Sequence, residues 1–375
     1  MALEFYGERL RLARLIKGVT LQEIGDAVAV TRQSIHQYES DVRAPATDVL
    51  NALAEYLEVS PGFFSVPLSG EVKPEQCHFR KRLTTPAGVK DRVQAYSTIL
   101  EQLVMELHEH LDLPENKFDL INNSEIPELT APIIEKIAEG ARLRWGLTSD
   151  APIDNMINVL ENQGAIVTCF DDVSDKVDAL SVNRKFPIII RNKAKESACR
   201  MRFDLAHECG HLIMHDGIET GCKQTEREAD IFASAFLFPR ESFAKEFPTC
   251  LSKGGSIDWK KIYELKLRWK VSAKAIIFRA NFLGFINAQQ YRNANVWFSQ
   301  TRQSRQERLD EIISLEEPHI LEEGIYVLKE QLGISFEMLA DKLKISPELL
   351  SKISGLAYSS RENKNLDDVI VPFKF

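Results

Sequence analysis

The sequence predicts a mainly α protein (α+β) in which helical regions surround one small β-sheet. Apolar residues recur every three or four positions in most of the longer segments, which is the period of an amphipathic helix. Two short apolar runs, 165–169 and 186–190, are typical of strands instead. The chain has 375 residues, too many for one ordinary domain. We therefore divide it into an N-terminal module (1–68), a basic linker and helical connector (69–130), a body (131–300) and a C-terminal helical region (301–375).

Composition narrows the class of protein. Apolar residues make up 44% of the chain, which is ample for buried cores, and the net charge of −8 argues against general adhesion to membranes or nucleic acid. No apolar run reaches the length of about 18 residues that a transmembrane helix needs. The N-terminus is charged, so we do not expect a signal peptide. These features predict a cytoplasmic protein without membrane partners, whose six cysteines stay reduced.

The N-terminal module has the spacing of two helices joined by a tight turn. An amphipathic helix begins near 10–14, a short helix capped by Thr20 follows over 19–28, and a third helix covers 31–39 after the turn at 29–31. This pattern resembles the Xre-type helix-turn-helix of lambda-like phage repressors over about residues 5 to 66. The resemblance implies a lambda-repressor-like, five-helix DNA-binding domain.

The third helix of this module is the expected reading helix. Such a helix lies in the major groove with its first residues facing base edges. Arg32 and Gln33 can make bidentate contacts to guanine and adenine respectively. Because one helix-turn-helix reads a half-site, we expect a homodimer on a palindromic operator. The remaining candidates are Gln22 and Arg43 at the phosphate backbone, and Thr31, Ser34, His36 and Gln37 around the reading helix.

The charge of the module is unusual for a DNA-binding domain. Residues 1–68 hold six Lys/Arg and nine Asp/Glu, so affinity for DNA requires a local basic patch. The following segment, 73–92, is rich in lysine and arginine. It can add phosphate contacts or bind the body, and the sequence does not choose between the two.

An H-E-x-x-H motif, residues 207–211, is the strongest signal of chemistry in the body. On a helix, positions i and i+4 share a face, so His207 and His211 can bind one metal ion. Glu208 lies beside that face and can take a proton from a metal-activated water. Apolar residues flank the motif at helical spacing, which predicts a helix packed in a core. We infer a metal-dependent hydrolase, of which a peptidase is the commonest kind.

A third ligand is expected from the next helix, 225–239, with Thr225 as its cap and Pro239 at its end. Glu226 and Asp230 share a face of this helix, so Glu226 can bind the metal while Asp230 orients a ligand histidine. Glu228 points elsewhere and is the alternative ligand or a solvated charge.

His215 continues the i+4 series but lies about 12 Å from His207 along the helix axis. That distance is too long for the two side chains to share one ion. We therefore expect His215 to be an ordinary residue at the helix end.

The segments FDLAHECGHLIMH and EREADIFASAFLFP resemble the ImmA/IrrE family of metallopeptidases, which share the gluzincin arrangement. The resemblance covers about residues 130 to 300 and implies a zincin-like helical domain with a small sheet. It places the metal ligands at His207, His211 and Glu226 and the general base at Glu208. Zn²⁺ is the expected cofactor, and another divalent ion can also suit such a site. Asp230 stands where the family more often has asparagine.

In such peptidases an edge strand can pair with an extended substrate. Residues 186–191 are our candidate for that strand, and a plain core strand is the alternative.

In the connector, the apolar stripe of Val93, Tyr96, Leu100, Leu103, Leu107 and Leu111 predicts a helix that packs on the body or on a second subunit.

The C-terminal segment 333–351 repeats the helix-turn-helix spacing of residues 18–38. Pro347 and Glu348 stand where Arg32 and Gln33 would read bases, which favours an interaction or dimer module over a second DNA reader. Two further helices are expected over 257–283, with a turn at Val271–Ser272.

The sequence therefore predicts a cytoplasmic transcriptional regulator that carries a zinc-dependent endopeptidase domain. The resemblances imply a role in stress response or in mobile-element and toxin–antitoxin control, through cleavage of a repressor or antitoxin. The alternative is a non-catalytic repressor or antitoxin whose peptidase-like body senses a signal or binds a toxin.

Overall fold

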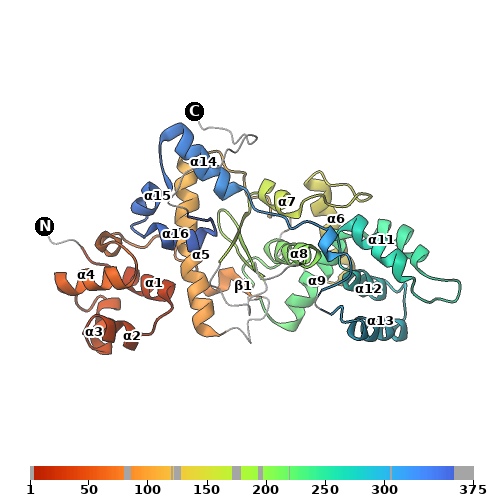
Figure 1. Cartoon of the computed structure of the whole chain (residues 1–375), viewed down its shortest axis with the longest axis horizontal. Helices are drawn as coiled ribbons and strands as arrows, with labels where there is room; N and C mark the ends of the chain where they lie inside the picture. Colours follow the sequence, from red (N-terminus) through yellow and green to blue (C-terminus); the bar gives the residue numbers. More distant parts are fainter. Residues whose placement is uncertain are drawn as a thin grey trace.

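The computed structural model describes residues 4–79, 86–119, 121, 128–170, 179–192, 197–218, 220–304 and 306–358. Arg80, Lys81 and Arg82 of the basic linker lie outside these ranges. The molecule is elongated, with the N-terminal helices at one end and helices α11 to α13 (residues 259–300) at the other (Figure 1). Within the described part of the chain, no helix is long and apolar enough to cross a membrane.

The N-terminal domain contains the five helices that the sequence predicts, and the fifth is a short 3₁₀ helix. They are α1 (Gly7–Lys17), α2 (Leu21–Ala27), α3 (Arg32–Glu39), α4 (Thr47–Tyr56) and η1 (Pro61–Ser65). Thr20 caps α2 in a reciprocal capping box with Glu23, as expected. Gly25 lets the two central helices meet, because a Cβ there would lie 2.8 Å from the carbonyl oxygen of Val30. The helix-turn-helix thus forms through local signals.

The connector forms one long helix, α5 (Ala87–His110), in agreement with its apolar stripe. The six residues of that stripe are buried. They do not pack on the body alone: α5 contacts α1 of the N-terminal domain and the C-terminal helices α14 (Ile320–Leu332) and α16 (Pro347–Ser354). Arg92 of α5 also donates to the carbonyl oxygen of Ile16 at 3.0 Å. Arg92 of the basic segment therefore binds the N-terminal domain in this structure.

Among the residues that the structure describes, four strands form one mixed sheet in the order β1-β3-β4-β2. Their bounds are β1 (Cys77–Phe79), β2 (Ile166–Cys169), β3 (Ala179–Val182) and β4 (Ile188–Arg191). The expectation that 186–191 is an edge strand is wrong, because β4 pairs with β2 on one side and β3 on the other. Its uninterrupted isoleucine run fits a strand that is buried on both faces. One edge is instead formed by β1, which comes from the predicted linker.

The body is built from helices that stack behind the sheet. They are α6 (Ala131–Arg144), α7 (Met156–Asn162), α8 (Ala198–Met214), α9 (Lys223–Leu237), α10 (Arg240–Glu246), η4 (Phe247–Cys250), α11 (Trp259–Trp269), α12 (Ala273–Phe282) and α13 (Ala288–Gln300). Helix α8 lies against β3, β4 and α9, and α6 covers the other side of α9. The pair expected over 257–283 corresponds to α11 and α12. Arg279 and Glu135 form a buried ion pair of 2.9 Å that joins α12 to α6.

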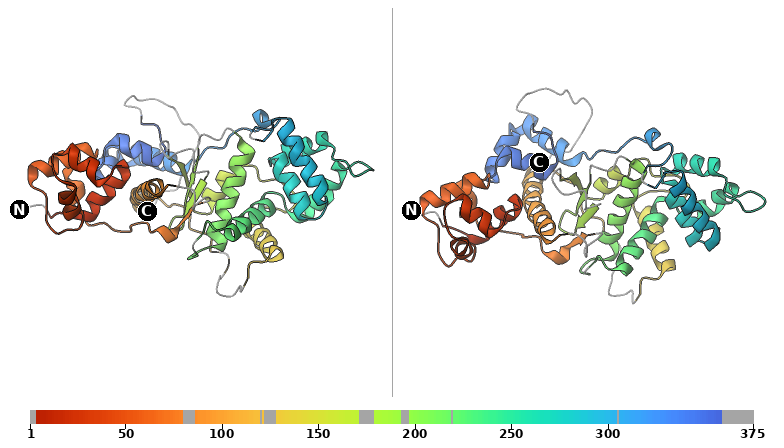
Figure 2. Two further views of the ribbon diagram at one scale, coloured as in Figure 1. Left: turned by 90° about the horizontal axis from the view of Figure 1, so that it is seen from below. Right: turned by 60° about the horizontal axis from the view of Figure 1, so that its bottom comes forward.

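The C-terminal helices α14 (Ile320–Leu332), α15 (Phe336–Lys342) and α16 (Pro347–Ser354) lie beside α5 and next to the N-terminal domain (Figure 2). Ser60 N–H donates to the Lys344 carbonyl at 2.9 Å, and Ser346 N–H donates to the Glu58 carbonyl at 3.1 Å. Helix α16 aligns with the reading helix, but its apolar face is buried against α5 and β2. This region thus connects parts of its own chain, and its role in a dimer stays a prediction.

Candidate metal centre and nucleic-acid interface

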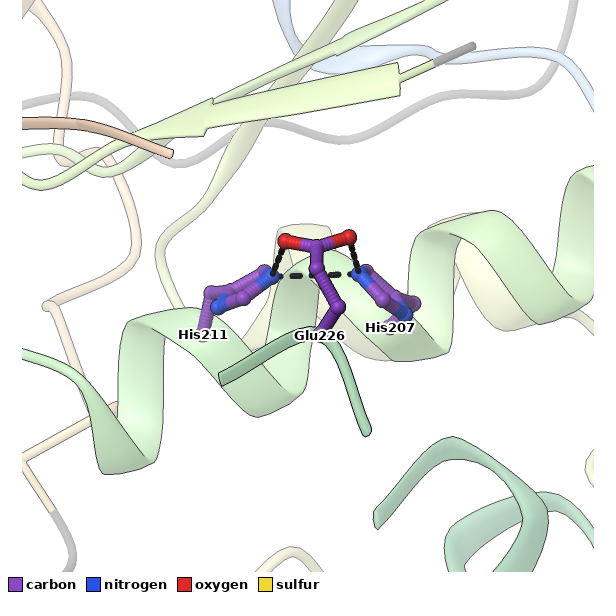
Figure 3. Close-up of side chains that lie close together, drawn as sticks. All are labelled: His207, His211 and Glu226. Carbon is purple, nitrogen blue, oxygen red and sulfur yellow. Dashed lines mark hydrogen bonds and ion pairs between the residues drawn. The ribbon is translucent and has the colours of Figure 1, made fainter. Parts of the chain in front are cut away.

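Helix α8 presents His207 and His211 on one face, one turn apart (Figure 3). Their Nε2 atoms lie 3.1 Å from each other. The carboxylate of Glu226 on α9 faces both rings. Its Oε2 lies 3.5 Å from Nε2 of His207, and its Oε1 lies 3.5 Å from Nε2 of His211. The structure therefore brings together the three side chains that the sequence proposed as ligands.

Close packing of α9 on α8 makes this convergence possible. Gly210, inside the H-E-x-x-H motif, faces Phe232, and a Cβ at position 210 would lie 3.0 Å from the Phe232 ring. Helix α9 begins at Lys223, with Cys222 as its cap, so the expectation that Thr225 is the cap is wrong. Thr225 instead donates its backbone N–H to the Cys222 sulfur. This earlier start places Glu226 at the first turn of α9, in front of the two histidines.

Asp230 orients His207. The Oδ1 atom of Asp230 lies 2.9 Å from Nδ1 of His207. Because an ionised carboxylate only accepts hydrogen bonds, the proton of a neutral His207 sits on Nδ1. The lone pair of Nε2 is then directed toward Glu226 and His211, as a metal ligand requires.

His211 is oriented by a chain of two further residues. Its Nδ1 lies 2.9 Å from Nδ1 of His215, whose Nε2 lies 2.9 Å from Oε2 of Glu228. When Nε2–H of His215 donates a hydrogen bond to the Glu228 carboxylate, Nδ1 of His215 is free of a proton and accepts a hydrogen bond from Nδ1–H of His211. Nε2 of His211 then keeps its lone pair. His215 is therefore not an ordinary helix-end residue, and Glu228 is neither solvated nor in the candidate ligand group. The spacing of residues along the sequence indicates only which side chains can share a metal ion, and it does not reveal this second chain.

The protonation of Glu228 agrees with this arrangement. Burial acts to raise the pKa of Glu228, but hydrogen bonds from His215 and Gln224 outweigh it, and the pKa falls below its ordinary value. The carboxylate is therefore ionised at neutral pH and accepts the proton of His215.

The three candidate ligands fit a tetrahedral divalent ion. Two nitrogens bound to zinc at about 2.0–2.1 Å would lie about 3.3 Å apart, close to the distances among these donor atoms. Oε1 of Glu226 is buried and makes no hydrogen bond within the described part of the chain. Two imidazoles and one carboxylate also match the ligand set of catalytic zinc sites. The geometry and the donor chemistry are both consistent with Zn²⁺.

Glu208 lies on the same helix between the two histidines and contacts the sheet. The hydroxyl of Ser181 on β3 donates to Oε2 of Glu208 at 2.7 Å. Ser181 was not among the predicted site residues, because nothing in a short four-residue strand distinguishes a serine that faces a site. The hydrogen bond fixes the carboxylate of Glu208, which lies on α8 next to the candidate ligand His207.

His78 is a second residue that the sequence argument missed. Its ring stacks on His211 with the centroids 5.4 Å apart and the planes 8° from parallel. Its Nδ1 lies 3.0 Å from the hydroxyl of Thr220. Burial, together with the nearby His215, lowers the pKa of His78 to about 3, so the ring is neutral. No sequence motif connects His78 with residues 207–211, because His78 belongs to the linker and lies far from them along the chain.

The predicted DNA-contacting residues gather around α3. Arg32 and Gln33 occupy its first two positions, and both side chains are exposed. Thr31 caps the helix by accepting the Ser34 N–H at 3.0 Å. Of the other candidates on this helix, His36 is exposed, and Ser34 and Gln37 are half-buried. Gln22 donates to Asp26 at 2.8 Å, and the guanidinium of Arg43 lies 5.0 Å from the centre of the Tyr38 ring. Arg32 and Gln33 are thus accessible where the sequence argument places base contacts.

Two protein-family models match parts of the chain that contain the two candidate sites. A family model described as a helix-turn-helix domain matches residues 7–63, and a peptidase family model described as the IrrE N-terminal-like domain matches residues 161–281. The chain joins a helix-turn-helix domain to an IrrE-like domain. The IrrE-like domain contains β2, β3, β4, α8 and α9, and therefore the three candidate ligands His207, His211 and Glu226. Strand β1 lies outside the matched residues. Comparison with curated proteins finds no match for the chain.

Proposed function

We propose that this protein is a cytoplasmic DNA-binding transcriptional regulator whose IrrE-like domain is a zinc-dependent endopeptidase. One observation supports the peptidase most directly: His207, His211 and Glu226 converge on one point, with both Nε2 lone pairs directed toward it. The proposed substrate is a repressor or antitoxin partner. The proposed setting is stress response or the control of mobile elements and toxin–antitoxin pairs.

The residues of the site have distinct roles in peptide hydrolysis. A divalent ion held there would act as a Lewis acid and lower the pKa of water. Glu208 takes the proton of the attacking water and passes it to the leaving amine. Ser181 keeps the Glu208 carboxylate in place, and Asp230 and His215 keep the ligand histidines in the required tautomer.

DNA binding is assigned to α3, with Arg32 and Gln33 as the base-reading pair. A single helix-turn-helix reads a half-site, so the proposal includes a homodimer on a palindromic operator. The N-terminal domain also contacts α5 and the C-terminal helices. Binding of DNA and the state of the IrrE-like domain can therefore influence each other through α5.

A second function is favoured by the closure of the site. The side chains of His207, Glu208 and His211 are all 0% exposed, and only Glu226 is partly exposed among the four central residues. A site that stays closed would bind metal without cleaving protein. The protein would then be a non-catalytic repressor or antitoxin whose body senses a signal or binds a toxin.

Metal analysis and a cleavage assay separate the two functions. We expect about one zinc per chain by mass spectrometry. The zinc should be lost in Glu226→Ala, bound more weakly in Glu228→Ala, which removes the carboxylate behind His215, and retained in Glu55→Ala at an exposed glutamate. With a helix-turn-helix repressor encoded beside the gene as substrate, wild type should cleave, and Glu208→Gln should bind metal without cleaving. Absence of metal from the zinc-supplied wild type would refute the peptidase proposal. Equal cleavage by Glu208→Gln would refute the role of Glu208.

A further inference from the structure

Strand β1 occupies the edge of β3, beside the metal centre. The two strands are antiparallel, and His78 is paired with Ser181. Asn183 N–H donates to the Gln76 carbonyl at 3.1 Å. Because hydrogen-bonded pairs alternate along an antiparallel ladder, His78 and Ser181 form the next such pair. The backbone of β1 thus occupies the hydrogen-bonding edge of β3.

The side chains of this pair lie on the face of the sheet that covers α8. Ser181 donates to Glu208, and His78 stacks on His211. Figure 1 shows β1 between α5 and α8, next to the sheet. Strand β1 therefore places one side chain directly against a candidate metal ligand, as a bound peptide strand would.

With β1 in this position the site is closed. His78 is buried together with His207, Glu208 and His211. Extended peptides are commonly recognised by adding a strand to a sheet edge, where the backbone supplies the hydrogen bonds. At β3 that edge is filled by the chain itself. A peptide that pairs with β3 next to Glu208 must first displace β1.

The origin of β1 indicates that it is an addition to the domain. It lies outside the residues that match the IrrE-like family model, in the segment that leads from the DNA-binding domain to α5. Arg184 fixes this segment by donating to the Gly70 carbonyl at 2.8 Å and to the Gln76 side chain at 3.0 Å. A strand tethered in this way has an effective concentration of about millimolar or more, so it outcompetes a dilute free peptide.

We propose that β1 is an internal occupant of the β3 edge. It takes the position in which an extended peptide substrate would pair with β3, and it inhibits the site until it is displaced. The inference rests on the proposed peptidase function. It adds that the substrate is an extended segment that pairs antiparallel with β3. It also adds that the site is regulated by the same segment that connects it to the DNA-binding domain.

Binding of the isolated strand tests the proposal. The probe is a fluorescent synthetic peptide with the sequence of residues 73–82, and the control peptide has proline at the position of His78. All chains carry Glu208→Gln so that the probe is not consumed, and all are loaded with zinc. We expect His78→Pro, which removes one donor from the ladder, to bind the probe about 10-fold or more tighter than the chain with native β1. His78→Ala keeps the backbone donor and should bind more weakly than His78→Pro.

A second variant keeps the proposal testable if the His78→Pro chain does not fold. Arg184→Ala loosens the segment before β1 without changing the strand, so it should also bind the probe more tightly. The matched control is Arg292→Ala on the exposed face of α13. Unchanged binding in a folded His78→Pro chain and in Arg184→Ala, or equal binding of the proline control peptide, would overturn the proposal. Strand β1 would then be a permanent part of the sheet.

Cleavage distinguishes failure of this inference from failure of the proposed function. In chains with Glu208 intact, we expect His78→Pro to cleave the repressor faster than wild type, and the wild-type chain to keep its intact mass. Tight probe binding without cleavage would support the internal occupant and refute the peptidase. Cleavage at equal rates by wild type and His78→Pro would support the peptidase and refute the occupant. Self-cleavage within β1 would make the strand a substrate and overturn the inhibition.

Discussion

Nδ1 of His211, a candidate metal ligand, lies 2.9 Å from Nδ1 of His215, which the sequence pattern alone indicates to be an ordinary helix-end residue. His215 is absent from the candidate ligand group, in agreement with its axial distance from His207. The same i+4 spacing, however, places His215 behind the ligand His211. Together with Glu228, it forms a buried chain that ends at an ionised carboxylate. His215 thus belongs to the candidate metal centre, behind one of its candidate ligands.

Replacement of His215 should therefore weaken metal binding. His215→Phe removes the acceptor for the Nδ1 proton of His211 and leaves Glu228 buried without its imidazole partner. We expect zinc affinity to fall about 10- to 100-fold. Competition with a chromophoric chelator measures this change. His319→Phe, the same substitution at an exposed histidine, should bind zinc as wild type does, and an unchanged affinity of His215→Phe would contradict the orienting role.

Two substitutions of Asp230 should lower zinc affinity to different extents. Asp230→Asn keeps an oxygen that can accept the Nδ1 proton of His207, while Asp230→Ala removes it. We expect zinc affinity to fall by about 10-fold or more in the alanine variant and by less in the asparagine variant. The same chelator competition gives both values. Equal losses in the two variants would show that the charge of Asp230, rather than its hydrogen bond, matters for the site.

The local parts of the metal centre could be predicted from the sequence. The spacing of His207 and His211 and the amphipathic pattern around Glu226 are properties of single helices, so they can be read without knowledge of the fold. Ser181 and His78 could not be predicted in this way. They reach α8 from separate strands, and their placement depends on the pairing of β1 with β3.

In the fold as well, local features could be predicted from the sequence, whereas contacts between distant segments could not. Caps and apolar stripes predicted α2, α3 and α5, because these signals act within one or two turns of helix. The position of β4 in the sheet was not predictable from residues 186–191 alone, because a buried isoleucine run suits a strand with one neighbour or with two. The burial of α16 against α5 and β2 also depends on contacts between distant segments.

The exposed start of α3 gives a test of DNA recognition. Arg32→Ala and Gln33→Ala combined should abolish the operator footprint, because each bidentate base contact contributes about 1–3 kcal/mol of discrimination. Lys260→Ala, which removes one positive charge from an exposed site on α11, is the control. A footprint that survives in the double variant would contradict the assignment of α3 as the reading helix.

Glu161 of α7 joins the body to the C-terminal helices and should make stability depend on pH. Its carboxylate accepts the N–H groups of His319 and Ile320 at the start of α14, at 3.1–3.3 Å. Burial nevertheless raises its pKa from 4.5 to about 7, against the opposing effect of these hydrogen bonds. The folded protein therefore favours the protonated form more strongly than the unfolded chain does.

The sign of the effect follows from this raised pKa. Below pH 4.5 the group is protonated in both states. Between about pH 4.5 and 7 the unfolded chain loses this proton while the folded protein keeps it, which lowers the free energy of unfolding. Glu161→Gln cannot ionise, so its stability relative to wild type should increase over this range by up to about 3 kcal/mol and then level off. Urea unfolding of both proteins between about pH 5 and 8 measures the difference. Glu55→Gln, at an exposed glutamate, should show no such trend, and parallel curves for Glu161→Gln and wild type would show that Glu161 does not change its ionisation on folding.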